Sequence, residues 1–157
     1  NFGARISLLS LGVGFMPNLS GRENAMLSGM LLGLGRKQIA GRLGAIMDFA
    51  ELGDFFDQPL RTYSTGMRAR LAFATAIQVD PDVLLVDEVL GVGDEAFREK
   101  SSAEMKKLIK SDKTVILASH ITHIMNDLCD RIVWIENGTV KYIGQAQPTL
   151  ELYTQKR

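Results

Sequence analysis

The sequence predicts an α/β fold in which a mainly parallel sheet adjoins a helical subdomain. Residues 83–86 are an unbroken apolar run, and residues 114–118 are apolar after Thr114. Both suit strands buried in a parallel sheet, although periodicity alone does not distinguish such a run from a buried helix segment. Segments with helical spacing alternate with these runs. A stretch of helical pattern without any strand signal, residues 18–60, is predicted to form the subdomain.

Composition places the chain among folded globular proteins. It has 157 residues, one domain's worth, of which 46% are hydrophobic and 23% charged. Lys+Arg and Asp+Glu both number 18, so the basic excess typical of a nucleic-acid binder is missing and no nucleic-acid partner is expected. The single cysteine, Cys129, fits a reducing compartment. The chain opens on Asn1 directly before a strand-like run, and we expect its natural beginning to be missing.

The first helical segment follows a Gly/Pro-rich loop at residues 12–18. Ser20 and Glu23 form a capping-box pattern, which predicts a helix over residues 22–34. A second helix is predicted over residues 37–50. The Met and Leu stripes of these helices are interpreted as core, with a surface that accepts a partner as the alternative.

A third helix is predicted over residues 63–77, with Met67, Leu71, Ala74 and Ile77 on one apolar face. Ser64, Thr65 and Gly66 lie at its start. The first turn of a helix offers unpaired N–H groups and the positive end of the dipole, which suits a phosphate, and Gly66 allows close approach. For these three residues alone, an ordinary Ser N-cap is the simpler interpretation.

Two carboxylates, Asp87 and Glu88, follow the strand predicted at residues 83–86. In open parallel sheets, ligands bind outside the carboxyl ends of the strands. One carboxylate there can hold Mg²⁺ through water, and a second can accept a proton from an attacking water. The alternative is that the two acids mark only where a buried strand reaches solvent.

The remaining elements follow in order. A Gly-rich loop ends in Asp94, and an amphipathic helix is predicted over residues 95–109. The strand at residues 114–118 leads to His120 and a further helix. Asn137-Gly138 between two apolar segments predicts a β-hairpin, and the tail is predicted to be a short polar helix or coil.

This order of pieces resembles an ABC-type ATPase domain, which implies a P-loop-NTPase-like sheet. Residues 63–67 resemble the family's signature motif, and residues 83–88 resemble its Walker B strand. Asp94 resembles the D-loop aspartate and His120 the switch-loop histidine.

The finer spelling is similar to the ATP-binding subunits that export cell-surface polysaccharides such as O-antigen, capsule or teichoic acid. The segments that carry this likeness are Leu11-Gly12-Val13-Gly14-Phe15, Gly21-Arg22-Glu23-Asn24, Tyr63-Ser64-Thr65-Gly66-Met67 and Val92-Gly93-Asp94 with Phe97 and Lys100.

Two departures from the family pattern qualify this resemblance. No G-x-x-x-x-G-K-[ST] P-loop occurs, so we expect a chain truncated before or at the P-loop, and an inactive fragment. The Q-loop glutamine has no counterpart near residues 15–18. The resemblance divides the chain into a helical subdomain at about residues 18–60 and a remaining core, residues 1–17 and 61–157, that ends in a hairpin.

By resemblance, two such domains form a homodimer around two ATP molecules. Asp87 would hold Mg²⁺ through water, Glu88 would orient or deprotonate the attacking water, and His120 would contact the γ-phosphate and the D-loop.

The Ser64–Met67 segment, comprising Ser64, Thr65, Gly66 and Met67, would complete the ATP site of the opposite subunit. An integral membrane permease would dock at residues 14–18 and the exposed Met-rich surface, on the cytoplasmic face of the bacterial inner membrane.

Two alternatives stay open. An ABC-type ATPase that acts on DNA or the ribosome would carry basic patches or long insertions, and the chain shows neither. A catalytically inert domain is permitted by the missing P-loop, but the retention of Asp87, Glu88, His120 and the signature motif argues against decay.

Overall fold

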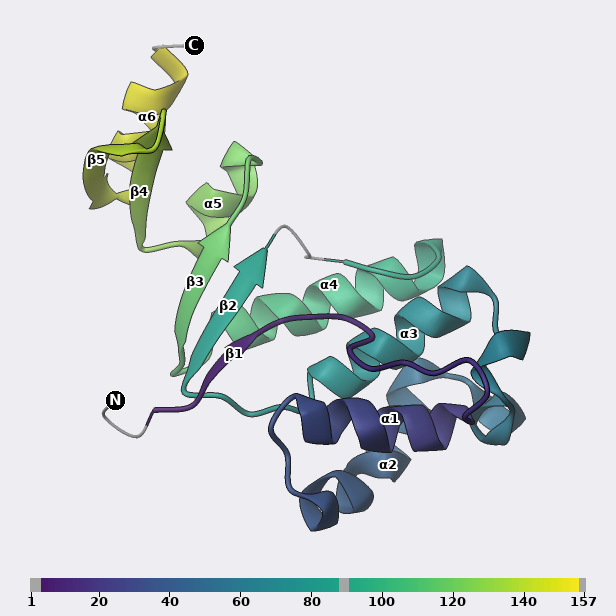
Figure 1. Ribbon diagram of the computed structural model, residues 1–157. Helices are drawn as coiled ribbons and strands as arrows, with labels where there is room; N and C mark the ends of the chain where they lie inside the picture. The colour runs from purple at the N-terminus through teal and green to yellow at the C-terminus, as the bar shows by residue number, and fades with distance from the viewer. Residues whose placement is uncertain (1–3, 88–90, 156–157) are drawn as a thin grey trace.

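Within the described residues, the larger of two sheets is parallel and three-stranded. The computed structural model describes residues 4–87 and 91–155. Strands β1 (Ile6–Leu8), β2 (Val83–Asp87) and β3 (Thr114–Ala118) lie in the order β1-β2-β3, with β2 in the middle (Figure 1). The apolar runs therefore form strands of a parallel sheet, as predicted.

The helical part consists of α1 (Gly21–Leu31), α2 (Arg36–Ala50) and two short 3₁₀ turns, η1 (Gly53–Asp57) and η2 (Leu60–Thr62), the latter two not predicted. The capping box is confirmed: the Ser20 Oγ accepts from the Glu23 N–H at 3.2 Å, and the Glu23 carboxylate accepts from the Ser20 N–H at 2.8 Å. Helix α1 ends at Leu31, three residues earlier than predicted. Gly33, two residues later, has a positive φ of 101°, which a helix cannot continue through. The division of the chain near residue 60 stays a prediction.

Helix α3 (Thr65–Ala76) belongs to two hydrophobic clusters. Leu71 and Ala74 pack with α1 and α2, whereas Phe73 and Ala76 pack with the sheet. The helix is therefore buried on all sides in its second half, and the prediction of one apolar face is too narrow. A helix that is covered all round is typical of a domain interior.

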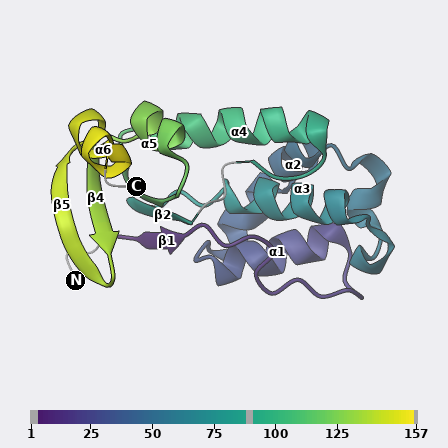
Figure 2. The same cartoon turned by 90° about the horizontal axis from the view of Figure 1, so that it is seen from above.

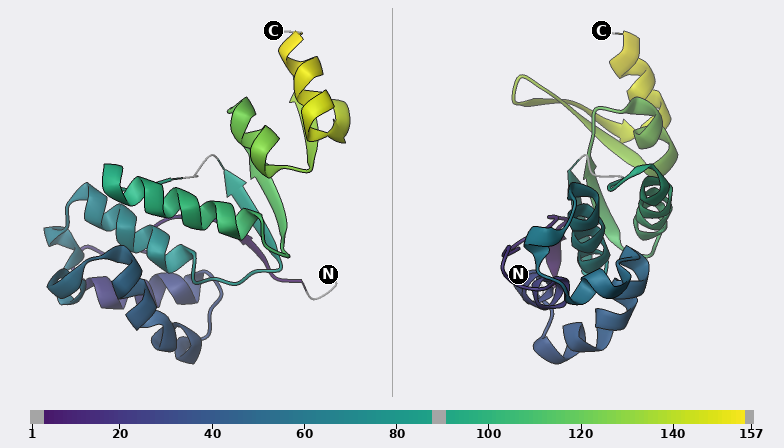
Figure 3. Two further views of the ribbon diagram at one scale, coloured as in Figure 1. Left: turned by 180° about the vertical axis from the view of Figure 1, so that it is seen from behind. Right: turned by 90° about the vertical axis from the view of Figure 1, so that its right-hand side faces the viewer.

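Helix α4 (Glu95–Ile109) runs beside α3 and covers the same side of the sheet (Figure 3). Its Phe97 and Met105 pack with Leu84 and Val86 of β2. Strand β3 departs from the prediction of a buried strand, because its Ile116 is 59% exposed. The described helices cover only one face of the sheet, so alternate side chains of β3 face outward.

The C-terminal part is a hairpin with a helix at each end. Helix α5 (Thr122–Leu128) precedes β4 (Arg131–Glu136) and β5 (Thr139–Gln145), which pair antiparallel. Asn137 and Gly138 have φ of 49° and 72°, as a two-residue hairpin turn requires, which confirms the predicted hairpin. Helix α6 (Ala146–Gln155) packs on it through Trp134 and Tyr153, whose ring centroids lie 5.5 Å apart.

None of the helices in residues 4–87 and 91–155 is long and apolar enough to span a membrane.

Candidate functional site

The carboxyl ends of β2 and β3 bring two predicted site residues to one edge of the sheet. Asp87 pairs in register with Ala118, and His120 follows two residues later. Both side chains are exposed. Glu88, the predicted catalytic base, lies outside the described residues, so its role stays a prediction.

Asp87 suits the Mg²⁺ ion that an ATP site needs. Mg²⁺ prefers oxygen ligands and keeps several waters, so one exposed carboxylate beside a polyphosphate is a sufficient protein contribution. Among the described residues, no group of three or more His, Cys, Asp or Glu side chains could hold a metal ion by itself. Asp87 therefore fits a Mg²⁺ that is held mainly by nucleotide and water.

The Ser64–Met67 segment forms the start of α3. Ser64 is the N-cap, and its Oγ accepts from the Met67 N–H at 3.1 Å. Thr65 and Gly66 are the first helical residues, while the Met67 side chain packs against the helical cluster. The structure thus contains the ordinary N-cap that the sequence allowed, together with the orientation of backbone N–H groups that suits a phosphate.

Asp94 lies directly beside this helix start. It is the N-cap of α4, its Oδ1 accepting from the Phe97 N–H at 3.1 Å, and its Oδ2 accepts from the Arg70 guanidinium of α3. A Cβ placed on Gly66 would lie 3.8 Å from the same Oδ2. The predicted D-loop aspartate and the predicted signature segment therefore lie side by side.

The hydrogen bond from Arg70, followed by that from the Phe97 N–H, holds the pKa of Asp94 below its ordinary value. Hydrogen bonds to the ionised form and a nearby cation both favour the carboxylate. Asp94 is thus a fixed anion next to the start of α3.

The predicted site residues fall into two groups on this chain. The starts of α3 and α4 lie together at the end of the molecule away from the tips of β2 and β3 (Figures 1 and 2). Asp87 and His120 form one group at the sheet edge, and Ser64–Met67 with Asp94 form the other.

Two of the polysaccharide-exporter segments contact each other. A Cβ on Gly21, the first residue of α1, would lie 2.0 Å from the Tyr63 Oη and 2.9 Å from the Phe56 carbonyl oxygen. The Tyr63 hydroxyl donates to the Phe55 carbonyl at 2.5 Å, and burial raises the pKa of Tyr63 to about 12. Glycine is thus the residue that lets the tyrosine reach its acceptor.

Asn24, in the same turn of α1, is fully buried and holds the loop before it. Its Oδ1 accepts from the Met16 N–H at 2.7 Å, and its Nδ2 lies 3.0 Å from the Met16 carbonyl, 3.0 Å from the Leu19 carbonyl and 2.9 Å from the Ser20 carbonyl. One side chain therefore fixes the loop where a membrane partner is predicted to dock.

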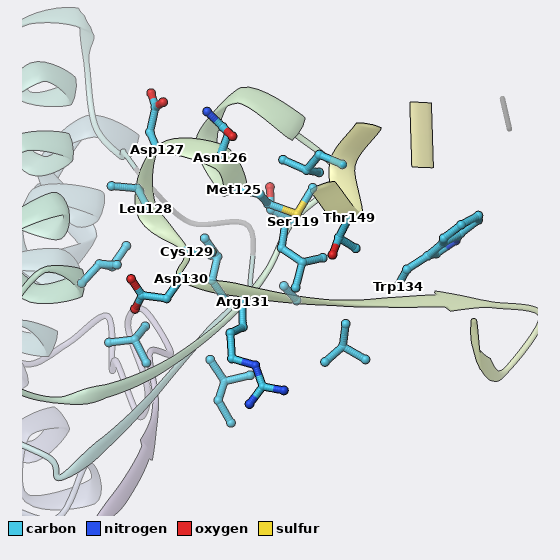
Figure 4. A pocket seen from close by; sticks show the side chains of 18 of the residues that line it. Ser119, Met125, Asn126, Asp127, Leu128, Cys129, Asp130, Arg131, Trp134 and Thr149 are labelled. Carbon is cyan, nitrogen blue, oxygen red and sulfur yellow. The ribbon is translucent and has the colours of Figure 1, made fainter. Parts of the chain in front are cut away.

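A cavity of about 1150 Å³ lies between β3, α5, the hairpin and α6 (Figure 4). Apolar side chains contribute much of its wall, among them Ile116, Val133 and Trp134, and Cys129 lies beside Asp130. Burial, followed by the Asp130 charge, raises the pKa of the Cys129 thiol. None of the predicted site residues belongs to the described lining, although Ala118 and Ser119, which directly precede His120, do.

Sequence reasoning missed Arg70 and Glu51 as parts of the site. Arg70 follows the signature segment by one helical turn, and a charged residue beside the apolar face of a buried helix is a usable signal. Glu51 carries no such signal. Its side chain reaches the site through contacts with Arg70 and Lys100, which are 19 and 49 positions away in the sequence.

A comparison of the sequence with known families identifies the family of this chain. The sequence model described as ABC transporter matches residues 1–91. The chain belongs to the ABC transporter family. The match covers the Ser64–Met67 segment and Asp87 but ends before Asp94 and His120.

Relatives within the ABC transporter family carry names from polysaccharide export. The O-antigen export system ATP-binding protein RfbB of Klebsiella pneumoniae is 46% identical over 95% of this chain and 61% of its own length. The O-antigen export system ATP-binding protein RfbB of Myxococcus xanthus is 45% identical over 96% of this chain and 35% of its own length. The teichoic acids export ATP-binding protein TagH of Lactiplantibacillus plantarum is 41% identical over 94% of this chain and 40% of its own length. The chain thus spans less than two thirds of the length of these relatives.

Solved structures share the fold. A dimeric ATP-binding cassette in a post-hydrolysis state, bound to ADP and Pi, superposes with a TM-score of 0.63 at 24% identity, over 91% of this chain and 63% of the other. The ATP-binding subunit of an ABC transporter superposes with a TM-score of 0.67 at 20% identity, over 96% of this chain and 62% of the other. These likenesses establish the α/β fold of an ATP-binding cassette.

Proposed function

We propose that this chain is part of the ATP-hydrolysing subunit of an exporter of cell-surface polysaccharide. The observation that carries the proposal is the division of the site residues into two separate groups. Asp87 and His120 lie at the sheet edge, whereas Ser64–Met67 and Asp94 lie at the starts of α3 and α4. A site that needs both groups has to take one of them from a second subunit.

Two subunits arranged head to tail in a homodimer would satisfy this requirement. The sheet edge of one chain would face the start of α3 of the other, and ATP would lie between them. The dimeric cassette with ADP and Pi, which shares the fold, supports this arrangement. Phosphoryl transfer is catalysed mainly by positioning and charge neutralisation, so bringing the two groups together would itself promote hydrolysis.

Within each site, Asp87 would hold Mg²⁺ through water. Bound Mg²⁺ would supply neutralisation of phosphate charge. Glu88 would orient the attacking water and accept its proton, and His120 would contact the γ-phosphate. The Ser64 hydroxyl and the N–H groups at the start of α3 would contact that phosphate from the opposite chain.

Glu88→Gln in the intact protein tests the assignment of the base. The amide keeps the size of the carboxyl group but cannot accept the proton, so turnover should fall by roughly 10²–10⁴ while ATP binding persists. Steady-state ATPase assays and nucleotide binding, measured on one preparation, separate the two effects. Near-normal hydrolysis in this variant would refute the role of Glu88.

The names of the relatives, which cite O-antigen and teichoic acids, support cell-surface polysaccharide as the substrate class. We therefore expect a strain that lacks the intact gene to lose its surface polysaccharide and to regain it with wild type, but not with Glu88→Gln. Unchanged surface polysaccharide in the deletion strain would contradict this substrate class.

The partner would be an integral membrane permease at the cytoplasmic face of the inner membrane. Met16, Met30 and Leu31 are exposed. Met30 and Leu31 therefore do not belong to the core, contrary to the prediction for their stripe, and Leu31 lies against Gly14 of the loop. Met16→Asp should abolish copurification with the permease, with Leu152→Asp, an exposed site on α6, as the control. Equal recovery of the permease with both variants would argue against this surface.

A further inference from the structure

Lys100 of α4 caps a different helix. Its ammonium donates to the Phe49 carbonyl at 2.9 Å and to the Glu51 carboxylate at 2.6 Å. Phe49 is in the last turn of α2, where carbonyl groups lack partners within the helix and the dipole favours a cation. Lys100 therefore ties the end of α2 to the middle of α4.

Aromatic rings surround this lysine. Its ammonium lies 4.6 Å from the ring centroid of Phe49 and 5.9 Å from that of Phe97. The rings of Phe49, Phe73 and Phe97, from α2, α3 and α4, contact one another at centroid distances of 5.6 to 6.2 Å. A cation over aromatic faces adds to its attraction for Glu51. The lysine therefore lies beside a ring cluster that joins three helices.

Glu51 carries the connection onward to α3. Its second carboxylate oxygen lies 3.5 Å from the Arg70 guanidinium, whose other terminal nitrogen donates to Asp94. The Arg70 side chain is only 18% exposed, and its guanidinium lies 5.2 Å from the Phe97 ring centroid. Within the described residues the buried Arg70 Nε has no hydrogen-bond partner, and the group is held through its two terminal nitrogens, which face Glu51 and Asp94.

The backbone of Glu51 supplies an independent sign of its importance. Glu51 is the C-cap of α2 with φ 55° and ψ 43°, the left-handed conformation that glycine adopts most readily. A residue with a Cβ is strained there. Such strain at a charged residue points to a function for the side chain, and here that side chain joins Lys100 to Arg70.

We infer that Lys100, Glu51 and Arg70 are positioning residues that hold Asp94 against the start of α3. The inference rests on the proposed function, because it concerns the part of this chain that would complete the ATP site of the other subunit. Both carboxylate oxygens of Asp94 are engaged, one by the Phe97 N–H and one by Arg70. The chain of contacts from Lys100 therefore fixes where Asp94 lies relative to Gly66.

Substitutions at Lys100 test the inference in the intact protein. Lys100→Met removes the charge but keeps an apolar stem between the rings, and should lower kcat by about tenfold while KM for ATP changes less than about twofold, because the residues that grip the nucleotide are untouched. Lys100→Arg keeps a cation at the same carbonyl and carboxylate, and should restore at least half of wild-type kcat. Lys107→Met, which removes a 2.9 Å ion pair with Glu104 on the same helix, is the control and should leave kcat unchanged.

Three results for kcat would overturn the inference: wild-type kcat in Lys100→Met, an equal loss in Lys107→Met, or no recovery in Lys100→Arg. A loss carried entirely by KM would also overturn it, because it would place Lys100 in nucleotide binding.

Hydrogen exchange without nucleotide separates this inference from the proposed function. Backbone amides in the last turn of α2 and the first turn of α4 should exchange at least about fivefold faster in Lys100→Met and at the wild-type rate in Lys107→Met. If the wild-type protein hydrolyses no ATP, the proposed function fails and the exchange rates still decide the positioning role. Unchanged exchange in Lys100→Met would refute it.

Discussion

Gly21 lies directly beneath the hydroxyl of Tyr63, so that a Cβ at residue 21 would lie 2.0 Å from the Tyr63 Oη. Gly21 begins α1, and Tyr63 immediately precedes the N-cap of α3. Two segments that are far apart in the sequence are therefore in contact. This contact connects α1, which follows the loop at residues 12–18, to the start of α3, which is proposed to face ATP.

Gly21→Ala should destabilise the chain by about 1–3 kcal/mol. The added methyl group would meet both the Phe56 carbonyl and the Tyr63 hydroxyl, which is held in place by its hydrogen bond to Phe55. Elsewhere in a helix the same change stabilises by up to about 1 kcal/mol, so the sign of the effect is diagnostic. Urea denaturation of wild type and of Gly21→Ala measures this difference in the free energy of unfolding.

Tyr63→Phe supplies the matched background for this experiment. Because the phenylalanine lacks the hydroxyl, Gly21→Ala should cost less in Tyr63→Phe than in wild type, with a coupling of about 0.5–3 kcal/mol. Additive effects of the two substitutions would contradict the contact.

Asn24 offers a test of the loop that precedes α1. Asn24→Ala leaves the Met16 N–H without its acceptor and removes the side-chain donor from three carbonyls, each of which keeps a backbone N–H donor. The substitution should cost about 1–3 kcal/mol. Asn24→Asp has nearly the same shape but directs a carboxylate at those carbonyls, so it should cost more than Asn24→Ala at neutral pH.

Acidification distinguishes the two Asn24 variants. Protonation of the carboxyl group restores a donor, so the deficit of Asn24→Asp relative to wild type should shrink as the pH falls towards about 5, whereas that of Asn24→Ala should stay constant. Denaturation curves at both pH values measure this. An aspartate variant as stable as wild type at neutral pH would disprove the hydrogen-bond arrangement.

The acid dependence of stability should report the contacts of Glu51. The hydrogen bond from Lys100 is the main cause that holds the pKa of Glu51 below its ordinary value of 4.5. A lowered folded-state pKa means that the contribution to stability is fully present above the unfolded value and is lost as the pH falls through the folded value. Wild type should therefore lose stability in that window.

In Lys100→Met the main cause of the lowered Glu51 pKa is gone, so less stability remains to be lost on acidification. The difference in free energy of unfolding between wild type and Lys100→Met should narrow as the pH falls below about 4.5, as measured by denaturation at each pH. A difference that stays the same from neutral to acid pH would show that Glu51 does not pair with Lys100.

Much of the fold could be predicted because its signals are local. The capping box of Ser20 and Glu23 defined the start of α1, and Asn137-Gly138 defined the hairpin. The strand signal of residues 83–86 placed Asp87 at the carboxyl end of a parallel strand, and the structure has it there.

Other features depend on packing between distant segments and could not be predicted. Lys100 and Glu51 are 49 positions apart, and only the convergence of α2 and α4 brings them together. The burial of α3 on all sides and the exposure of Ile116 likewise depend on which elements cover each face, which periodicity within one segment does not reveal.

The most direct test of the central claim combines two inactive subunits. In the intact protein, Ser64→Arg blocks the start of α3 by bulk and charge, and Glu88→Gln removes the proposed base, so each homodimer should be inactive. If the two groups of residues act across the interface, a mixed dimer of the two variants retains one complete site, and random pairing should restore about a quarter of wild-type ATPase activity. A mixture as inactive as either variant alone would show that Ser64 and Glu88 serve the same subunit's site, and would contradict the account.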